Sequence, residues 1–389
     1  MRHRRFTVRF ALAFVALAAP GCGAPASVGN VDPVPAAAVA PAPAVSDDPV
    51  IAAPVDESLV LPAASALPLG ASDVLRLSDA DAIEVGSVAL PMKDGSVVVV
   101  FDRLDAAFTR GSLYSARSSR GRRFTKPAPF ARGSDAYVVG PSAVIRAGSA
   151  FLYHEEAKTL QGRPSMWRSA LGADGHWAAA ERLPAIADVT SLLSWPEVTA
   201  MGEGALLAFR GGATSACRVA TSTDGVTFAM KTPPCTTAAA MAASATFANG
   251  SLAFSHQNGD PANMISYVMT SNDRGASWST PLVVSNAADV HDTSFVKRLD
   301  GGLDLYFIYP PDDHGFSLFR RALTPAGVLG PEERVTQSSL GEPSKPHVAR
   351  LTDGRLLLSY AEIAKRGPSA EPTVQRIVLA SLAKDAPAP

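Results

Sequence analysis

Cysteine is scarce in this chain, which contains only Cys22, Cys217 and Cys235. Without a matching cluster of further Cys or His residues, these argue against a structural zinc site. The chain also lacks a Gly-x-Ser-x-Gly elbow, a Gly-rich phosphate loop before a helix, and a stripe of alternating basic and aromatic residues. These absences argue against the common α/β-hydrolase, nucleotide-binding and nucleic-acid-binding motifs. We therefore expect no metal, no cofactor and no nucleic-acid partner.

Neither sign of charge dominates the composition. The 35 Lys and Arg residues nearly balance the 36 Asp and Glu residues, which leaves a net charge of -1. Such a chain has no general electrostatic attraction to nucleic acid or to an acidic membrane surface. The apolar run from Phe10 to Ala19 is too short to span a bilayer.

The first residues have the pattern of an export signal. Basic residues from Arg2 to Arg9 precede the apolar run, and Gly21-Cys22 follows it. This ending resembles the lipobox of bacterial lipoproteins, which implies that Cys22 carries a lipid and anchors the protein in the cell envelope, at the outer membrane. Ordinary cleavage near Ala18 or Ala24 would instead give a periplasmic or secreted protein. Residues 1–22 are the predicted signal in either case.

Residues 23–68 are rich in Ala, Pro, Val and Ser and carry few charges. Proline at this density blocks helices and interior strands and favours an extended, mobile chain. We interpret the segment as a flexible tether. Residues 69–385 then form one large domain.

A turn motif recurs along this domain. Its fullest form, Ser-x-Asp-x-Gly-x-x-Trp, uses the Asp to accept hydrogen bonds within the turn and the Gly to supply a backbone angle that other residues resist. The turn glycines Gly121, Gly175, Gly225, Gly275 and Gly327 are separated by 54, 50, 50 and 52 positions by subtraction. The motif residues are Ser271, Asp273, Gly275 and Trp278, and in a shorter relative Ser222, Asp224, Gly225 and Phe228.

A second repeat lies between these turns. Each unit is an apolar strand, a turn containing Gly and another apolar strand, a pattern typical of a hairpin. Two hairpins in about 50 residues make one four-stranded propeller blade. We therefore predict an all-β fold, a six-bladed β-propeller of four-stranded antiparallel blades. The six units are Ser87 to Phe101, Ser142 to Tyr153, Glu197 to Phe209, Ser244 to Ser255, Thr293 to Tyr309 and His347 to Tyr360.

The turn motif resembles the Asp-box, or BNR repeat, of the sialidase-like six-bladed propellers, over about residues 85 to 382. The resemblance implies the architecture and not the chemistry, because the family holds sialidases, other glycoside hydrolases and non-catalytic binding proteins. It also implies that function lies on the face opposite the Asp-box turns.

Two long-range contacts follow from the repeat. Cys217 and Cys235 flank the Asp224 turn at nearly opposite positions, so we expect a disulfide, with two separate buried thiols as the alternative. The last blade has an apparent third strand, Thr373 to Leu382, and no fourth. We expect the segment from Asp73 to Val85 to pair with it and close the ring; the alternative is that this segment packs against the side.

Polar residues gather where the second strand of each predicted blade ends, as a polar ligand would require. The ligand-binding candidates are Asp102, Arg103, His154, Glu155, Arg210, His256, Tyr309, Asp312, His314, Tyr360 and Glu362. Connections between blades add Asp135, Tyr137, Trp195, Glu197, His291, Asp292, Glu342 and Lys345.

The chain departs from a sialidase in the arginines that clamp the sugar carboxylate. The Phe/Tyr-Arg-Ile-Pro motif that sialidases share before the first blade is absent; Arg103, Arg210 and Arg366 are candidate clamps without a motif. Tyr360 and Glu362 have the spacing of a nucleophile pair, and Glu155 or Glu156 with Asp312 or Asp313 would suit another glycosidase. No catalytic residue is assigned.

The sequence is compatible with three functions. The first is a monomeric, lipid-anchored envelope protein that binds a glycan or an envelope or extracellular protein. The second is an exo-glycosidase of sialidase type, and the third is a scaffold for envelope assembly. The membrane is contacted through the lipid alone.

Overall fold

The computed structural model describes residues 56–383 except 79–80, 106–109, 132–136, 160–161, 174, 187–188, 190–194, 212–215, 233, 236–238, 259–263, 313–314, 338–339 and 367–371. The described chain is almost entirely β, with one short 3-10 turn, η1 (Ala71–Asp73), and no α-helix. None of its helices is long and apolar enough to cross a membrane. The predicted signal peptide and Cys22 lie outside the described residues.

Three separate sheets have four antiparallel strands each. They are β12 (Glu197–Met201), β13 (Gly204–Gly211), β14 (Ala216–Ser222) and β15 (Ala229–Met230); β16 (Ala239–Thr246), β17 (Leu252–Asn258), β18 (Ser266–Ser271) and β19 (Leu282–Val283); and β20 (His291–Lys297), β21 (Leu303–Asp312), β22 (Gly315–Leu323) and β23 (Glu333–Arg334).

A twelve-stranded sheet contains the remaining long strands. Its members are β2 (Val74–Arg76), β3 (Ile83–Pro91), β4 (Val97–Leu104), β5 (Gly111–Ser118), β7 (Ala128–Ala131), β8 (Tyr137–Arg146), β9 (Ser149–Ala157), β10 (Ser165–Ala170), β11 (Glu181–Arg182), β24 (Glu342–Arg350), β25 (Leu356–Arg366) and β26 (Pro372–Leu382). Its antiparallel groups join only through single parallel pairs, Gln375 with Ile83 and Gly111 with Tyr137.

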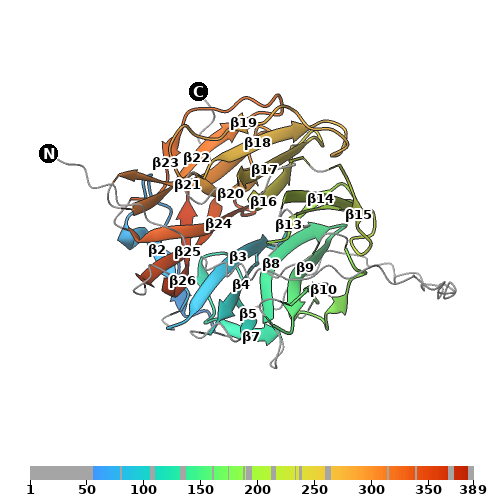
Figure 1. Ribbon diagram of the computed structural model, residues 1–389. Coiled ribbons are helices and arrows are strands. Elements are labelled where there is room, and N and C mark those ends of the chain that lie inside the picture. The colour runs from blue at the N-terminus through green and yellow to red at the C-terminus, as the bar shows by residue number, and fades with distance from the viewer. Residues whose placement is uncertain are drawn as a thin grey trace, which may run out of the picture.

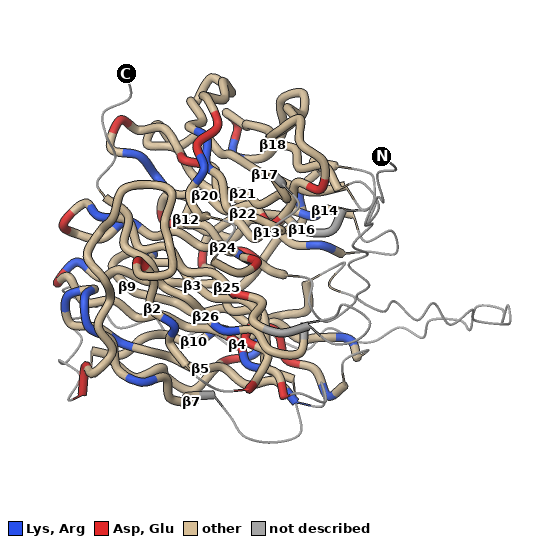
Figure 2. Tube along the Cα trace, turned by 90° about the vertical axis from the view of Figure 1, so that its left-hand side faces the viewer, with Lys and Arg blue, Asp and Glu red and all other residues tan. Residues whose placement is uncertain are grey.

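The sheets lie around a common centre, with β3, β8, β16, β20 and β24 nearest to it (Figure 1). Seen from the side, basic and acidic residues are interspersed along the trace (Figure 2). The predicted hairpins are confirmed: Ser87 pairs with Phe101, and Ser142 with Tyr153, at the ends of two predicted units. Alternating apolar residues and turn glycines were therefore sufficient to locate these strands.

The antiparallel group of strands that contains β4 is buried on both faces. In β4, Val98 and Val100 pack in one apolar cluster with Leu152 of β9, whereas Val99 and Phe101 pack in another with Leu357 of β25. Successive side chains point to opposite faces of a strand, so a strand buried on both faces is apolar at every position. This alternation also decides which neighbouring sheet each polar side chain at the end of a strand will meet.

The predicted closure by the N-terminal segment is confirmed. β2 pairs antiparallel with β26, with Val74 opposite Ala380 and Arg76 opposite Val378. Arg76 also donates two hydrogen bonds to Glu362, Nε to Oε2 at 2.7 Å and Nη2 to Oε1 at 2.7 Å. β2 is thus held to β25 and β26 by both backbone and side chain.

Part of the predicted tether belongs to the packed structure. Leu59–Val60 forms strand β1, which pairs with β6 (Arg123–Phe124). Leu61 is buried, and its N–H donates to the Arg122 carbonyl at 2.8 Å. The proline-rich composition hid these isolated leucines, and the boundary expected at residue 69 is too late for this part of the chain.

The two fullest turn motifs have similar hydrogen bonds. Asp273 Oδ1 accepts from Ser271 Oγ at 2.8 Å and from the Ser277 N–H at 2.8 Å. Asp224 Oδ1 likewise accepts from Ser222 Oγ at 2.8 Å and from the Thr227 N–H at 2.8 Å. Each carboxylate therefore stabilises its own turn, and each lies on a connection between the third and fourth strands of a sheet.

The expected disulfide is present between Cys217 and Cys235, whose Cα atoms are 5.7 Å apart. Cys217 lies in β14 and Cys235 follows β15. Both are buried in an apolar cluster between this sheet and the next, with Leu206, Phe254 and Met269.

Candidate functional site

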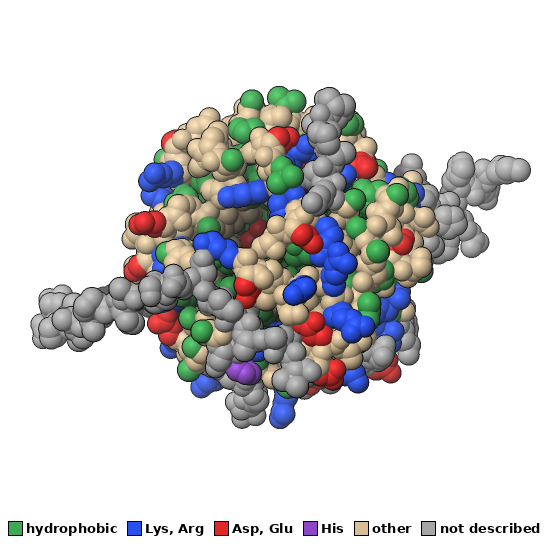
Figure 3. All heavy atoms as spheres, turned by 180° about the vertical axis from the view of Figure 1, so that it is seen from behind, with side chains coloured by type: hydrophobic (Ala, Val, Ile, Leu, Met, Phe, Trp, Pro, Cys, Tyr) green, Lys and Arg blue, Asp and Glu red, His purple; other side chains and the backbone are tan. Residues whose placement is uncertain are grey.

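A cavity of about 420 Å³ occupies the centre of the molecule. Its walls come from the first strand of each hairpin, namely β3, β8, β12, β16, β20 and β24. Trp195, Asp292 and Lys345 line it near the start of these strands, and Lys297 and Arg350 line it near their ends. Seen from behind, Lys and Arg side chains gather around a hollow near the centre of that face (Figure 3).

Five of the six lining strands, all but β12, have a β-bulge near their starts. An extra residue there re-aims the side chains and increases the local twist. Among the described strands, register shifts lie between Glu84 and Ser87, Val139 and Ser142, Ala239 and Ala242, His291 and Ser294, and Ser344 and His347. The bulges place Gly86, Gly140, Asp292 and Lys345 along the cavity wall, and Trp195 lines it just before β12.

Three large side chains are held here in left-handed backbone conformation. Trp195 has φ 50°, Asp292 51° and Lys345 51°. Side chains with a Cβ resist this region, and such strain concentrates at functional sites because the surrounding structure must enforce it. In the described chain, six residues other than glycine have positive φ, and half of them are these three.

Lys345 reaches across the cavity. Its Nζ atom lies 3.6 Å from the centre of the Trp195 ring, a cation–π contact between β24 and the segment before β12. The Lys345 N–H donates to Asp292 Oδ2 at 3.0 Å. Burial lowers the pKa of Lys345 to about 8, with the Arg210 charge lowering it further and Asp292 opposing the shift.

Asp292 is the anionic partner in this group. Besides the Lys345 backbone, its Oδ2 accepts from Ser344 Oγ at 3.1 Å and lies 3.5 Å from His291 Nδ1. Burial alone would raise the pKa of Asp292, but the Lys345 and His291 charges and these hydrogen bonds lower it overall. Asp292 is therefore ionised over the whole physiological range.

Glu197 has the opposite electrostatic environment. It lies on β12 in the lining of the same cavity, and its Oε1 accepts one hydrogen bond, from the Ser244 N–H at 3.3 Å. Burial raises the pKa of Glu197 to about 8, which the Ser244 hydrogen bond opposes only in part. The cavity thus holds a protonated carboxyl and an ionised one at neutral pH.

Three of the predicted ligand-binding residues lie at this end of the cavity. Asp102 Oδ1 accepts from the Gly86 N–H at 2.6 Å and Oδ2 from the Gly140 N–H at 3.0 Å, so Asp102 holds two of the bulges. Burial raises the pKa of Asp102 and these backbone N–H groups oppose the shift. Burial lowers the pKa of Arg210, which the Glu155 carboxylate opposes. Asp102 therefore holds the cavity wall through its backbone, whereas Arg210 acts on the Lys345 charge and Glu155 on the Arg210 charge.

The other described candidates lie elsewhere in the fold. Arg103 forms a salt bridge with Glu84 at 2.6 Å and covers the Tyr114 ring at 3.9 Å. His154 contacts Glu156 at 3.0 Å. Strand alternation is the cause: Arg103 and His154 project to the sheet face opposite that of Asp102 and Glu155, which are their immediate neighbours in sequence.

Four more candidates have structural surroundings. Tyr309 donates to Glu332 at 3.1 Å on the outer part of its sheet, and Tyr360 is fully buried in an apolar cluster. Glu362 forms a salt bridge with Arg76. His256 lies between two sheets, stacked on Tyr267.

The sialidase features are therefore not assembled by the described residues. Arg103 forms a salt bridge with Glu84, and Glu362 forms one with Arg76. Tyr360 is buried in the core. Asp313 and His314 lie outside the described residues, as do the side chains of Asp312 and Arg366.

The sequence carries a signal for the bends at the starts of the lining strands. Proline follows the left-handed residue in Gly140-Pro141, Trp195-Pro196 and Lys345-Pro346, at equivalent places in the repeat. Within sheets, proline is confined to edges, strand starts and bulges, because it cannot donate a ladder hydrogen bond. Recurrent X-Pro at the start of an apolar strand therefore indicated where the strands bend into the cavity.

No family model and no curated protein sequence matches this chain. Solved structures do. A protein of unknown function from Dyadobacter fermentans superimposes with a TM-score of 0.62 at 14% identity, covering 79% of this chain and 98% of its own. The NanB sialidase of Streptococcus pneumoniae gives a TM-score of 0.63 at 10% identity, covering 77% and 68%. A GH93 α-L-arabinofuranosidase of Fusarium graminearum, solved with arabinobiose, gives 0.56 at 10% identity, covering 77% and 92%.

These likenesses establish the architecture. The chain has a sialidase-like β-propeller fold, shared with glycoside hydrolases of different specificity. At such low identity the fold is the extent of what the likeness shows, because one fold supports many functions.

Proposed function

We propose that this chain is an exported, lipid-anchored envelope protein whose six-bladed propeller binds a glycan at the end of the central cavity that holds Trp195, Lys345 and Asp292. The four-stranded groups and the period of the Asp-box turns support six blades. The signal-like residues before Cys22 support export and lipidation. Residues 23–55 then connect the anchor to the packed domain.

The observation that carries the proposal is the strained group Trp195, Asp292 and Lys345. An aromatic ring, a cation and an anion in one concave site are the groups that bind sugar rings and hydroxyls. The bulge itself does not require a large side chain in this strained conformation, because glycine occupies the equivalent position in β8.

Binding is tested with the full chain in detergent on an array of neutral and acidic glycans. Trp195→Ala and Lys345→Met should each weaken binding at least tenfold, whereas the matched control Lys126→Met, at an exposed lysine, should not. Absence of any glycan ligand, or binding indifferent to both variants, would overturn the proposal in favour of a protein ligand or a scaffold.

Glycoside hydrolysis is the second candidate function. It is favoured by Glu197 and Asp292, whose pKa values shift in opposite directions beside one cavity. Such a divided pair can supply a general acid and an ionised base or nucleophile. Fluorogenic glycosides, including a sialoside, would be hydrolysed by the wild type, 100-fold or more slowly by Glu197→Gln, and normally by Glu203→Gln at an exposed turn. No hydrolysis across the panel would rule this function out.

A further inference from the structure

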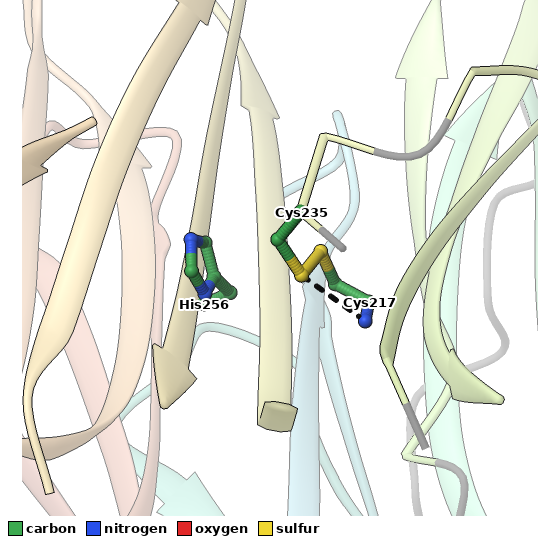
Figure 4. A group of neighbouring side chains, drawn as sticks. All are labelled: Cys217, Cys235 and His256. Atoms are coloured by element: carbon green, nitrogen blue, oxygen red, sulfur yellow. Dashed lines mark hydrogen bonds between the residues drawn. A yellow bond between two sulfur atoms is a disulfide. The ribbon is translucent and has the colours of Figure 1, made fainter. Parts of the chain in front are cut away.

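The structure brings His256 to the disulfide, although the residue is distant in sequence from Cys217. The two sulfur atoms and a ring nitrogen of His256 all lie within 4.8 Å of one another, and all three residues are buried. Figure 4 shows the three side chains as neighbours, with the Cys217 N–H donating to Cys235 Sγ at 3.2 Å. The histidine comes from β17 and the cysteines from the preceding sheet.

His256 is unusual for a buried histidine. Its relative exposure is 5%, and neither ring nitrogen has a hydrogen-bond partner within the described residues. Its ring is stacked on Tyr267, with 5.3 Å between ring centres, which fixes its plane. A neutral imidazole keeps a lone pair on one ring nitrogen, which can bind a metal ion.

We propose that Cys217, Cys235 and His256 form a redox-gated zinc site, closed while the disulfide is intact and able to bind one Zn²⁺ once the disulfide is reduced. In the first step a dithiol gives two electrons and two protons to the disulfide, yielding two thiols and the oxidised dithiol. In the second step Zn²⁺ displaces both thiol protons and is bound by two thiolates and the neutral imidazole.

Geometry and charge both fit this ion. Tetrahedral Zn²⁺ with bonds of about 2.3 Å to sulfur and about 2.1 Å to nitrogen needs its ligand atoms about 3.5 Å apart. The sulfurs would separate from bonding distance and the imidazole would approach by about 1 Å, shifts that side-chain rotation can supply. Two thiolates neutralise Zn²⁺, so a neutral complex replaces the disulfide in an apolar cluster. Water can complete the coordination beside Cys235, which is 8% exposed.

The site is independent of the proposed glycan site. Cys217 and Cys235 pack between the sheet that contains β14 and the sheet that contains β17, whereas the cavity is lined by the first strand of each hairpin. Zinc binding can therefore fail while the proposed function stands, and the reverse.

The test uses the full chain with Cys22→Ser, so that Cys217 and Cys235 are its only thiols. The protein is reduced with a phosphine, kept free of oxygen and titrated with Co²⁺ and then with Zn²⁺ against a chromophoric chelator. We expect one ion per reduced chain, with thiolate-to-cobalt absorption, and none in the oxidised chain. Cys217→Ser should abolish that absorption.

The histidine has its own matched control. His256→Gln should weaken zinc binding at least tenfold, whereas His176→Gln, at an exposed histidine, should leave it unchanged. Should His256→Gln fail to fold, X-ray absorption at the zinc edge of the folded parent chain identifies the zinc ligands. We expect two sulfur ligands and one imidazole nitrogen ligand from the protein. Absence of binding by the folded reduced chain, or zinc with only oxygen and nitrogen ligands, would overturn the proposal.

Discussion

The Lys345 ammonium lies 3.6 Å from the centre of the Trp195 ring and joins β24 to the segment before β12 across the cavity. Both residues are held in left-handed backbone conformation, and each is followed by proline. The contact therefore depends on two bends in the backbone as well as on the attraction between cation and ring. Substitution of the prolines would alter the bends, and substitution of Lys345 or Trp195 would alter the attraction.

Lys345 should be an unusually reactive amine. Because burial lowers its pKa to about 8, its neutral fraction should rise with a midpoint near that pH, whereas exposed lysines titrate near about 10.4. Competitive amine labelling read by mass spectrometry gives the midpoint, with the other lysine peptides as comparison. Asp292→Asn should move it lower, since Asp292 raises the pKa of Lys345. A midpoint equal to that of the other lysines would contradict the burial.

Glu197 should make the fold less stable as pH rises. Its pKa is raised to about 8 by burial, against about 4.3 for an unfolded glutamate, so the folded state holds the extra proton between these values. The stabilisation from this proton is complete below about pH 4 and is lost as pH rises to about 8. Urea midpoints at several pH values should show a smaller decline in Glu197→Gln than in Glu203→Gln. Parallel curves would refute the assignment.

Asp102→Asn should destabilise the protein by about 2–3 kcal/mol. The carboxylate now accepts a hydrogen bond from each of two backbone N–H groups, and in the variant a buried amide nitrogen would face one of these donors. Those donors are the N–H groups of Gly86 and Gly140. Urea unfolding measures the loss, and Asp289→Asn, at a partly exposed turn, is the isosteric control. Equal stability of the two variants would show that Asp102 does not hold the bulges.

Acid should destabilise the two turn motifs in a narrow range. The pKa of Asp273 is lowered to about 2 by hydrogen bonds from Ser277 and Ser271. The pKa of Asp224 is also lowered to about 2, because hydrogen bonds from Thr227 and Val226 outweigh burial. Their stabilisation is present above about pH 4 and is lost as pH falls through about 2. The double variant Asp224→Asn/Asp273→Asn should lose less stability across this range in urea titrations than the wild type.

Arg76→Gln should cost about 1–2 kcal/mol, since it leaves the buried Glu362 carboxylate with weaker hydrogen bonds. The exposed Arg182→Gln is the control. Limited proteolysis should also cut the N-terminal segment sooner in Arg76→Gln, as the pairing of β2 with β26 loosens. Unchanged cleavage would mean that backbone pairing alone holds the segment.

The strands were predictable because apolar alternation and turn glycines leave a periodic record, and the closure was predictable because the last blade lacked a strand. Val74 to Arg76 was accordingly assigned correctly. Leu59 and Leu61 were not, because isolated leucines among prolines have no period.

The site was predicted only in part, for a different reason. Residue type on the connections between strands identified Trp195, Glu197, Asp292 and Lys345, which line the cavity. Residue type at the ends of strands identified Asp102, Glu155 and Arg210, but also Arg103 and His154, which face the other way. Sequence cannot assign a strand face to a particular neighbouring sheet when a bulge shifts the alternation by one residue. The proximity of His256 to Cys217 similarly depends on how two sheets pack, which leaves no local pattern.

The pairing of β2 with β26 orders events during synthesis. β2 is made early and its partner β26 is the last strand made, so the ring stays open until almost the whole chain has left the ribosome. Closing so long a loop costs entropy that local hairpins do not incur, and such contacts slow folding. A chain truncated before Pro372 would therefore expose unpaired strand edges and aggregate, whereas a circular permutant that links the two termini should fold faster.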